Sequence, residues 1–402
     1  MAERTNLHKA GRQGTGKRPY TGSRARTINR TRPSERSRER IIRRAHAMDY
    51  SILFLVLFLV GFGLIMIYST SSYKGGLYYN DPAYWLKRQA LFAGVGAVAM
   101  LIIARLDYHL WKSRDILIYV YYGLTVFLLL FTLVFAAVSH GSKRWIGVGP
   151  VRFQPSEAAK VSLILILAIY ISRNARQMRD TRGIMITFLM VAPIIGLVGV
   201  ENLSTCIILL AITVIMIFVA SSKYVPFFFM GGVAGLGVGV LLLTASYRLE
   251  RITTWLHPET SEKGMQTMQG LYAIGSGGLF GKGLGQSMQK MGFLPETHND
   301  MIFSIVCEEL GLFGAICVIA LYFILLWRFL RVAMKSTDLF GSMIVVGAIA
   351  HIGIQVFINI GVVTNTIPNT GIPLPFISYG GTSMLFLLVE MGLVLSVSRY
   401  TR

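Results

Sequence analysis

Long apolar runs separated by short polar segments dominate this chain. Most of the runs reach roughly 18 residues with few charges, the length that a helix needs to cross the ~30 Å hydrocarbon core of a bilayer. We predict about ten spans, at approximately 50–69, 88–105, 115–138, 156–172, 183–200, 203–220, 225–246, 301–328, 340–361 and 381–398. Alternating barrel segments are absent, so the predicted fold is an all-α polytopic membrane protein.

Composition agrees with this pattern. Hydrophobic residues make up 53% of the 402 residues, and charged residues make up only 14%. The surface of a water-soluble globule of this size carries far more charge. The sequence therefore excludes a soluble enzyme or binding module.

The first 48 residues differ from the rest of the chain. The formal net charge is +20, and much of it falls in this segment, which has almost no large apolar residue. We predict a disordered basic cytoplasmic tail at 1–48 and a membrane domain at 49–402. The expected contact of the tail is anionic lipid. Because the charge is not spread over a folded surface, we expect no nucleic-acid partner.

Lysine and arginine also recur in alternate loops between the predicted spans. By the positive-inside rule, these loops and both termini are cytoplasmic. The opposite, outer face then receives the loops at about 70–87, 141–155, 247–300 and 362–380, of which 247–300 is the largest. The unusual polar motifs lie in these outer segments, so we expect the active face there.

Charged residues flank the start of the fourth span. Arg144 lies beside Trp145, and Glu157 and Lys160 lie one helical turn apart after Pro155. One interpretation is an interfacial loop with a self-neutralising ion pair. The other is a cavity, because charges at membrane depth are expensive and usually face one.

The large outer loop adds further charge. Arg248 and Arg251 are three residues apart and would project to one side of a helical turn as anion ligands, or form a solvated interfacial helix. The run Gly275–Gly285 is not a phosphate loop, because Ser276 and Gly283 break the required pattern and no strand precedes it. We expect its glycines to let backbone amides approach a ligand, with Lys282 adding charge.

Several carboxylates lie at or near predicted span ends. Asp300 begins the eighth span after Glu296 and His298, and it is either a helix cap or a functional group. Glu308 and Glu309 lie about two turns deeper, where at least one needs a buried polar partner such as Lys160 or a water cavity. A further carboxylate, Glu201, is either a cap of the sixth span or a functional residue.

The segment 365–382 contains three prolines and three glycines. It is too broken for a helix and too apolar for a solvated loop. We predict a re-entrant element that lines a polar site.

These motifs resemble those of the bacterial SEDS family (shape, elongation, division and sporulation) of the FtsW, RodA and SpoVE type. The matching segments follow in order: Lys143-Arg-Trp-Ile146, Phe153-Gln-Pro-Ser-Glu157 with Lys160, Tyr247-Arg248 with Arg251, Ala273–Gly278, Gly281–Gly285, Leu294-Pro-Glu296, His298-Asn-Asp300, Glu308–Gly311 and Thr370–Gly381. Two positions depart from the family. Asn299-Asp300-Met301 stands where Thr-Asp-Phe is frequent, and Glu201-Asn-Leu-Ser-Thr205 replaces Pro-Asp-Leu-Gly-Thr.

The resemblance implies a multi-pass enzyme of the bacterial cytoplasmic membrane. It would polymerise lipid II, a disaccharide-pentapeptide on undecaprenyl diphosphate, into β-1,4-linked glycan strands with inversion. Asp300 matches the family's catalytic carboxylate, and we predict that it is the general base for the acceptor hydroxyl. The candidate substrate and diphosphate ligands are Arg144, Lys160, Arg248, Arg251, Lys282 and Ser378. The supporting polar residues are Glu157, Glu201, Glu296, His298, Glu308 and Glu309.

No residue spacing identifies a metal site, and a divalent cation such as Mg²⁺ on the diphosphate is the candidate cofactor. The resemblance implies a class B penicillin-binding transpeptidase as partner, with other division or elongation proteins. The division, elongation and sporulation branches all stay open. The alternative function is a lipid II flippase or transporter, since broken segments and intramembrane charges are typical of transporters.

Overall fold

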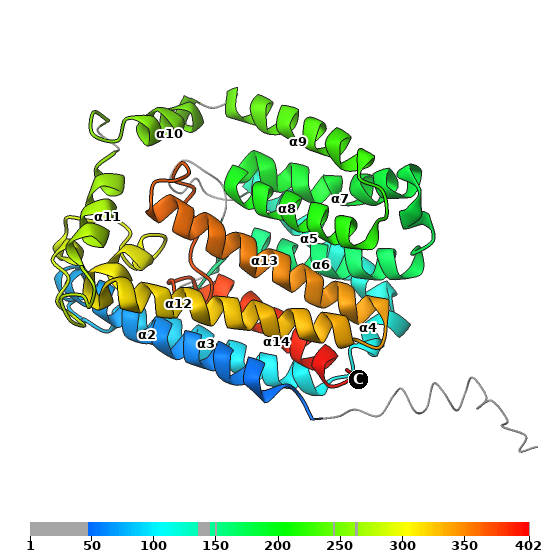
Figure 1. Cartoon of the computed structure of the whole chain (residues 1–402), viewed down its shortest axis with the longest axis horizontal. Coiled ribbons are helices and arrows are strands. Elements are labelled where there is room, and N and C mark those ends of the chain that lie inside the picture. Colours follow the sequence, from blue (N-terminus) through cyan, green and yellow to red (C-terminus); the bar gives the residue numbers. More distant parts are fainter. Residues whose placement is uncertain (1–46, 136–144, 149–150, 244–245, 262–263, 402) are drawn as a thin grey trace, which may run out of the picture. The chain divides into compact units, whose positions relative to one another are not determined.

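A computed structural model describes residues 47–135, 145–148, 151–243, 246–261 and 264–401, and these residues are mostly helical (Figure 1). The long helices are α2 (Tyr50–Tyr79), α3 (Tyr84–Arg105), α5 (Ile116–Phe135), α6 (Pro155–Arg173), α7 (Thr181–Glu201), α8 (Leu203–Ala220), α9 (Val225–Leu243), α12 (Ile302–Lys335), α13 (Leu339–Val363) and α14 (Gly381–Ser398). The predicted all-α class is confirmed. Residues 1–46 of the predicted tail and Arg144 lie outside the described residues.

Nine of these helices, all but α9, are long and apolar enough to cross a membrane, counted within the described ranges. The seventh predicted span, 225–246, corresponds to α9, in which Val225–Gly237 forms a shorter apolar stretch. The protein is therefore a multi-pass membrane protein. Which end of the helices faces the cytoplasm stays a prediction.

Shorter elements fill the connections. They are the helices α4 (His109–Ser113), α10 (Ser246–Leu256) and α11 (Met265–Ser276), the 3₁₀ turns η1 (Gln177–Arg179) and η3 (Gln289–Met291), and the hairpin of β1 (Ile146–Val148) with β2 (Val151–Phe153). The sequence predicts 247–300 as one large loop, but α10 and α11 lie within it. Both are too short to span a bilayer, so a search for long apolar runs does not find them.

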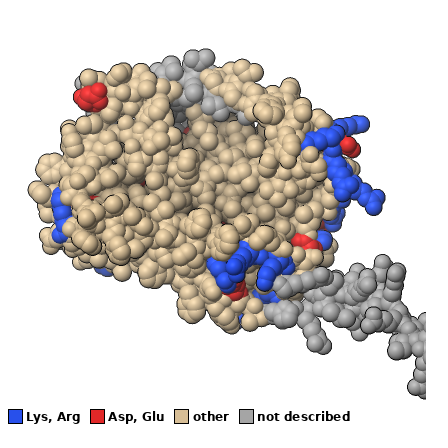
Figure 2. All heavy atoms as spheres, viewed as in Figure 1, with Lys and Arg blue, Asp and Glu red and all other residues tan. Residues whose placement is uncertain are grey.

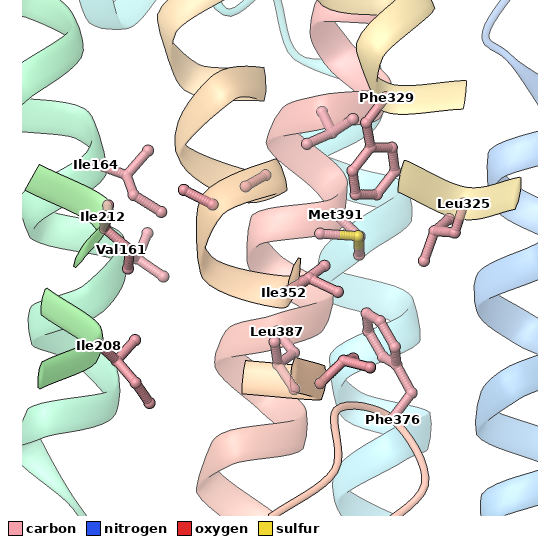
Figure 3. Packing of buried hydrophobic residues seen from close by; sticks show 14 of the residues in the cluster. Val161, Ile164, Ile208, Ile212, Leu325, Phe329, Ile352, Phe376, Leu387 and Met391 are labelled. Atoms are coloured by element: carbon pink, nitrogen blue, oxygen red, sulfur yellow. The ribbon is translucent and has the colours of Figure 1, made fainter. Parts of the chain in front are cut away.

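The core is built around α13. Figure 3 shows side chains of α6 and α8, such as Ile164 and Ile212, on one side of α13, and side chains of α12 and α14, such as Phe329 and Met391, on the other. Glycines let some helices approach closely. A Cβ at Gly392 of α14 would lie 2.8 Å from the Met100 carbonyl of α3. Such small residues at helix contacts are typical of membrane proteins, in which van der Waals packing drives association.

Lysine and arginine side chains are concentrated at one end of the helical bundle. On the face seen in Figure 2, they gather at the end that carries α4, and the rest of that face is largely uncharged. This distribution agrees with the charged loops that the sequence indicates for one side of the membrane.

Candidate active site

A cavity of about 1180 Å³ lies at the end of the bundle that carries α10 and α11. Its walls come mainly from α3, α6, α8, α10, α13 and the starts of α11 and α14, together with the non-helical residues 295–296, 299–300 and 369–373. Five predicted site residues line it: Glu157, Lys160, Arg251, Glu296 and Asp300. The fold thus brings together residues that are far apart in the sequence.

Asp300 is the carboxylate buried most deeply in the segment before α12. It is 7% exposed, and its Oδ1 has no hydrogen-bond partner within the described residues. Burial raises the pKa of Asp300 to about 7, and the negative charge of Glu296 adds to the rise, while Arg251 opposes it. The cap residue of α12 is Met301, so the alternative in which Asp300 caps this helix is wrong. A carboxylate with this pKa can accept a proton near neutral pH.

Glu157 and Lys160 form a buried ion pair at the start of α6. Lys160 Nζ lies 2.9 Å from Glu157 Oε2, and the two side chains are 3% and 8% exposed. Pro155 begins the helix at a position where its missing N–H costs nothing. The pair lines the cavity, which agrees with the cavity interpretation, and the self-neutralising ion pair of the other interpretation is also present.

Glu296 and His298 precede Asp300 in the same segment, and of the two only Glu296 lines the cavity. Glu296 is exposed and has φ of 52°, a left-handed conformation that is rare outside glycine. His298 is buried, with its ring centroid 5.0 Å from Trp85 and 5.6 Å from Tyr379. Burial lowers the pKa of His298 to about 4. His298 is therefore neutral at neutral pH and acts as a packing residue.

α10 carries Arg251 to the cavity. Arg251 Nη1 donates to the Asn369 carbonyl at 3.3 Å, and Trp255 Nε1 donates to the Asn365 carbonyl at 3.0 Å. These contacts fasten α10 to the non-helical segment before α14. The helical turn predicted for Arg248 and Arg251 is confirmed, although the side chain of Arg248 lies outside the described residues.

The glycine-rich loop folds back onto α12. The N–H groups of Lys282 and Gly283 donate to the carbonyls of Glu308 and Glu309 at 2.9 and 3.0 Å. α12 is interrupted there by Gly311, which has φ of 69°. The glycines permit this close contact between main chains, and the interpretation of these amides as a ligand cradle is wrong.

Lys282 and Lys290 neutralise the two glutamates of α12. Lys282 Nζ lies 2.7 Å from Glu308 Oε1, and Lys290 Nζ lies 2.9 Å from Glu309 Oε1. Each carboxylate also accepts a hydrogen bond from a serine hydroxyl. The expectation that at least one of these glutamates has a buried polar partner is confirmed, but the partner is Lys290 and not Lys160, which pairs with Glu157. Lys282 is not among the residues that line the cavity, so its position does not support a role as a diphosphate ligand.

Two other predicted residues have structural positions. Ser378 Oγ accepts from the Leu374 N–H at 2.8 Å and stabilises a turn. The cap of α8 is Asn202, whose side chain accepts from two N–H groups, and Glu201 is the last residue of α7. The prediction that Glu201 caps this helix is wrong. Asn202 lines the cavity, whereas Glu201 is not among its lining residues.

The segment before α14 is broken and partly buried, as predicted, and its re-entrant path in the membrane stays a prediction. Residues 367–380 are not helical, and Ile372, Leu374, Phe376 and Ile377 are buried in the core. The residues 369–373 line the cavity. The prediction of a broken, buried element at a polar site is confirmed.

A metal site is not evident from the side chains. Over the part of the chain that the structure describes, no group of three or more His, Cys, Asp or Glu residues could hold a metal ion. Hard divalent cations require several oxygen ligands. The side chains of the described residues alone do not form such a site.

Residues 50–402 match the family model of FtsW, RodA and SpoVE, which is described as cell cycle protein. The chain belongs to this family. Its relatives include stage V sporulation protein E of Bacillus subtilis (strain 168), 42% identical over 368 residues that cover 88% of this chain and 98% of the relative. Another is the probable peptidoglycan glycosyltransferase FtsW of Geobacter sp. (strain M18), 34% identical over 367 residues that cover 90% and 99%.

Solved structures of the FtsW/RodA/SpoVE type share the fold. Thermus thermophilus RodA, a rod shape determining protein, has a TM-score of 0.66 at 26% identity and covers 89% of this chain and 99% of its own. A chain from a peptidoglycan synthase complex, studied for its coordination of polymerization and crosslinking, has a TM-score of 0.71 at 27% identity and covers 88% and 98%.

The cavity of this FtsW/RodA/SpoVE member also has residues that the sequence analysis does not single out. Arg88 of α3, Thr205 of α8 and Gln355 of α13 line it. The available signal is a polar residue inside an apolar run, because such residues in membrane helices face a cavity or a partner. The sequence alone does not show which cavity or partner each of these polar residues faces.

Proposed function

We propose that this protein is a peptidoglycan glycosyltransferase that polymerises lipid II into glycan strands. The observation that carries the proposal is the position of Asp300, a buried carboxylate with a pKa of about 7, in one cavity with Lys160 and Arg251. The names of the relatives support it.

In the proposed reaction, Asp300 takes the proton of the acceptor sugar's 4-hydroxyl. The oxygen lone pair attacks the anomeric carbon of the donor, and the bond from that carbon to the diphosphate oxygen breaks. The electron pair leaves with the diphosphate. Attack opposite the leaving group converts an α-linked donor into a β-linked product. A positioned base contributes roughly 10² to 10⁴ in rate.

Lys160 and Arg251 are the candidates to stabilise the diphosphate as its charge increases. Lys160 Nζ forms an ion pair with Glu157 Oε2 at 2.9 Å, and an ammonium has three donors to offer an anion. Lys160 is 3% exposed, and charge stabilisation is stronger at such a buried position. Arg144 and Arg248 remain predicted ligands of the diphosphate. A divalent cation bound to the diphosphate remains the candidate cofactor, and no step of the proposed reaction depends on it.

The orientation of the protein follows from charge. We place the end with the concentrated lysines and arginines, and both termini, in the cytoplasm. The cavity at the other end then faces the outer side of the bacterial cytoplasmic membrane. There it could receive a sugar headgroup while the polyprenyl chain stays in lipid.

We also propose a class B penicillin-binding transpeptidase as partner. A structural relative comes from a peptidoglycan synthase complex that coordinates polymerization with crosslinking. Such a partner would receive the nascent strand. The division, elongation and sporulation branches are each represented among the similar proteins, so we assign none.

The test is polymerisation of lipid II by the purified protein in detergent or liposomes. We expect glycan strands from the unaltered protein and none from Asp300→Ala. Normal strand synthesis by Asp300→Ala would refute the assignment of the base.

The transport alternative has one observation in its favour. His351 and Glu390 form a buried pair at 2.7 Å in the middle of α13 and α14, and intramembrane charges of this kind occur in transporters. Lipid II translocation in proteoliposomes, measured separately from polymerisation, distinguishes the two functions. We expect polymerisation without translocation.

A further inference from the structure

A side chain of α13 holds the main chain of Asp300. The amide of Asn359 donates to the Asp300 carbonyl at 2.8 Å and to the Ile372 carbonyl at 2.9 Å. Asn359 is 1% exposed, so water does not compete for these bonds. One side chain therefore joins the segment that carries the carboxylate to the non-helical segment that lines the same cavity.

Asn359 belongs to a polar stripe on an otherwise apolar helix. His351, Gln355 and Asn359 are spaced by four residues and share one face of α13. Gln355 Nε2 donates to the Pro373 carbonyl at 2.9 Å, and His351 pairs with Glu390 of α14. Polar groups inside a membrane domain are costly unless they are paired. Asn359 and Gln355 both bind carbonyls of the non-helical segment before α14, whereas His351 binds α14 itself.

We propose that Asn359 is a positioning residue that sets the direction of the Asp300 carboxylate. Asp300 lies just before α12 begins, so no helical hydrogen bond from α12 fixes its carbonyl. Loss of the Asn359 amide would leave that carbonyl buried without a donor, which costs free energy until the peptide group rotates. Rotation would carry the carboxylate with it. The catalytic meaning of this inference rests on the proposed function.

The first test compares two sites that support the same non-helical segment. Asn359→Ala and the similarly sized Asn359→Leu both lose the donor to the Asp300 carbonyl. Gln89→Leu loses the bonds to the Ser378 carbonyl and the Gly380 N–H, at 3.3 and 3.1 Å, but does not contact Asp300. Since a misplacement of about 1 Å can cost roughly 10²-fold, we expect both Asn359 variants to lower kcat about 10- to 100-fold with KM within about threefold.

Gln89→Leu should lower kcat much less. An equal loss of kcat in the Asn359 and Gln89 variants would mean that Asn359 supports only the segment, and it would overturn the proposal. Unchanged kcat in Asn359→Ala would do so as well.

A second measurement does not need the reaction. Asp300→Asn removes a buried charge and should raise the unfolding temperature more at pH 8 than at pH 5. The same substitution is then made in Asn359→Ala, with Glu296 and Arg251 unchanged. There the Asp300 carboxylate can turn freely, so the extra rise in unfolding temperature at pH 8 over pH 5 should be smaller by roughly half. An unchanged gain would overturn the positioning role. Failure of the unaltered protein to polymerise lipid II would instead refute the proposed function and leave this readout intact.

Discussion

Lys160 lies 2.9 Å from Glu157, three residues away on α6, and both side chains are buried in the wall of the cavity. Desolvation makes a buried ion pair costly, and a well-packed apolar pair of similar volume is often at least as stable. Stability alone therefore does not explain the pair. Under the proposed function, the pair holds an ammonium in the cavity for the diphosphate.

Lys160→Met should lower the activity by more than its loss of stability explains. We expect polymerisation to fall about 10²-fold or more, because the leaving group loses its buried cation. Because Glu157 is then a buried charge without its partner, the free energy of unfolding should fall by about 3–5 kcal/mol. The double variant Lys160→Met/Glu157→Gln should recover most of the stability and none of the rate. Recovery of the rate in the double variant would contradict the role of Lys160.

Lys282→Ala is expected to behave differently. Its ammonium is bound to Glu308, which is fully buried, so the substitution leaves a buried carboxylate without its cation. We expect lower thermal stability and a change in KM for lipid II of less than about threefold, because no interaction with the diphosphate is lost. Lys282→Ala/Glu308→Gln is the stability control. A large rise in KM would restore Lys282 as a substrate ligand.

The pKa of about 7 at Asp300 predicts opposite effects of pH on rate and stability. Polymerisation should rise with pH through about 7 as the base loses its proton. The folded-state pKa lies above the unfolded value of about 3.9, so the folded protein holds more protons between these values and stability falls as pH rises from 4 to 7. The rate of polymerisation and the unfolding temperature, each measured from pH 4 to pH 8, check the two predictions. Asp300→Asn should flatten this part of the stability profile, and a profile that stays as steep would contradict the shift.

Gly311→Ala tests the contact between the glycine-rich loop and α12. Gly311 has φ of 69°, and an added Cβ would meet the main chain of Leu279 and Gly281. We expect a loss of about 2 kcal/mol or more, visible as a lower unfolding temperature. The control is Gly275→Ala in α11, where no atom lies within 4 Å of the added Cβ. Equal unfolding temperatures for the two variants would show that the contact is unimportant.

The sequence predicts much of the fold because the bilayer imposes length and polarity on each span. It also identifies Glu157, Lys160 and Asp300, since charged residues at membrane depth need a cavity or a partner. The same reasoning does not assign partners. Glu308 pairs with Lys282 only because the glycine-rich loop turns back onto α12, and that contact depends on backbone geometry.

The stripe of His351, Gln355 and Asn359 shows the same limit. The spacing is visible in the sequence, but what each residue touches depends on the path of the non-helical segment before α14. Three prolines in that segment indicate only that it is not a helix. Packing against α2, α12 and α13 determines the rest.

The most direct test of the account is the rate of glycan synthesis by purified Asp300→Asn. This variant keeps the shape of the side chain and removes the base. We expect a folded protein, at least as stable as the unaltered one at pH 7.5, that makes no detectable strands from lipid II. Strand synthesis at the unaltered rate would contradict the central claim that Asp300 is the general base of this cavity.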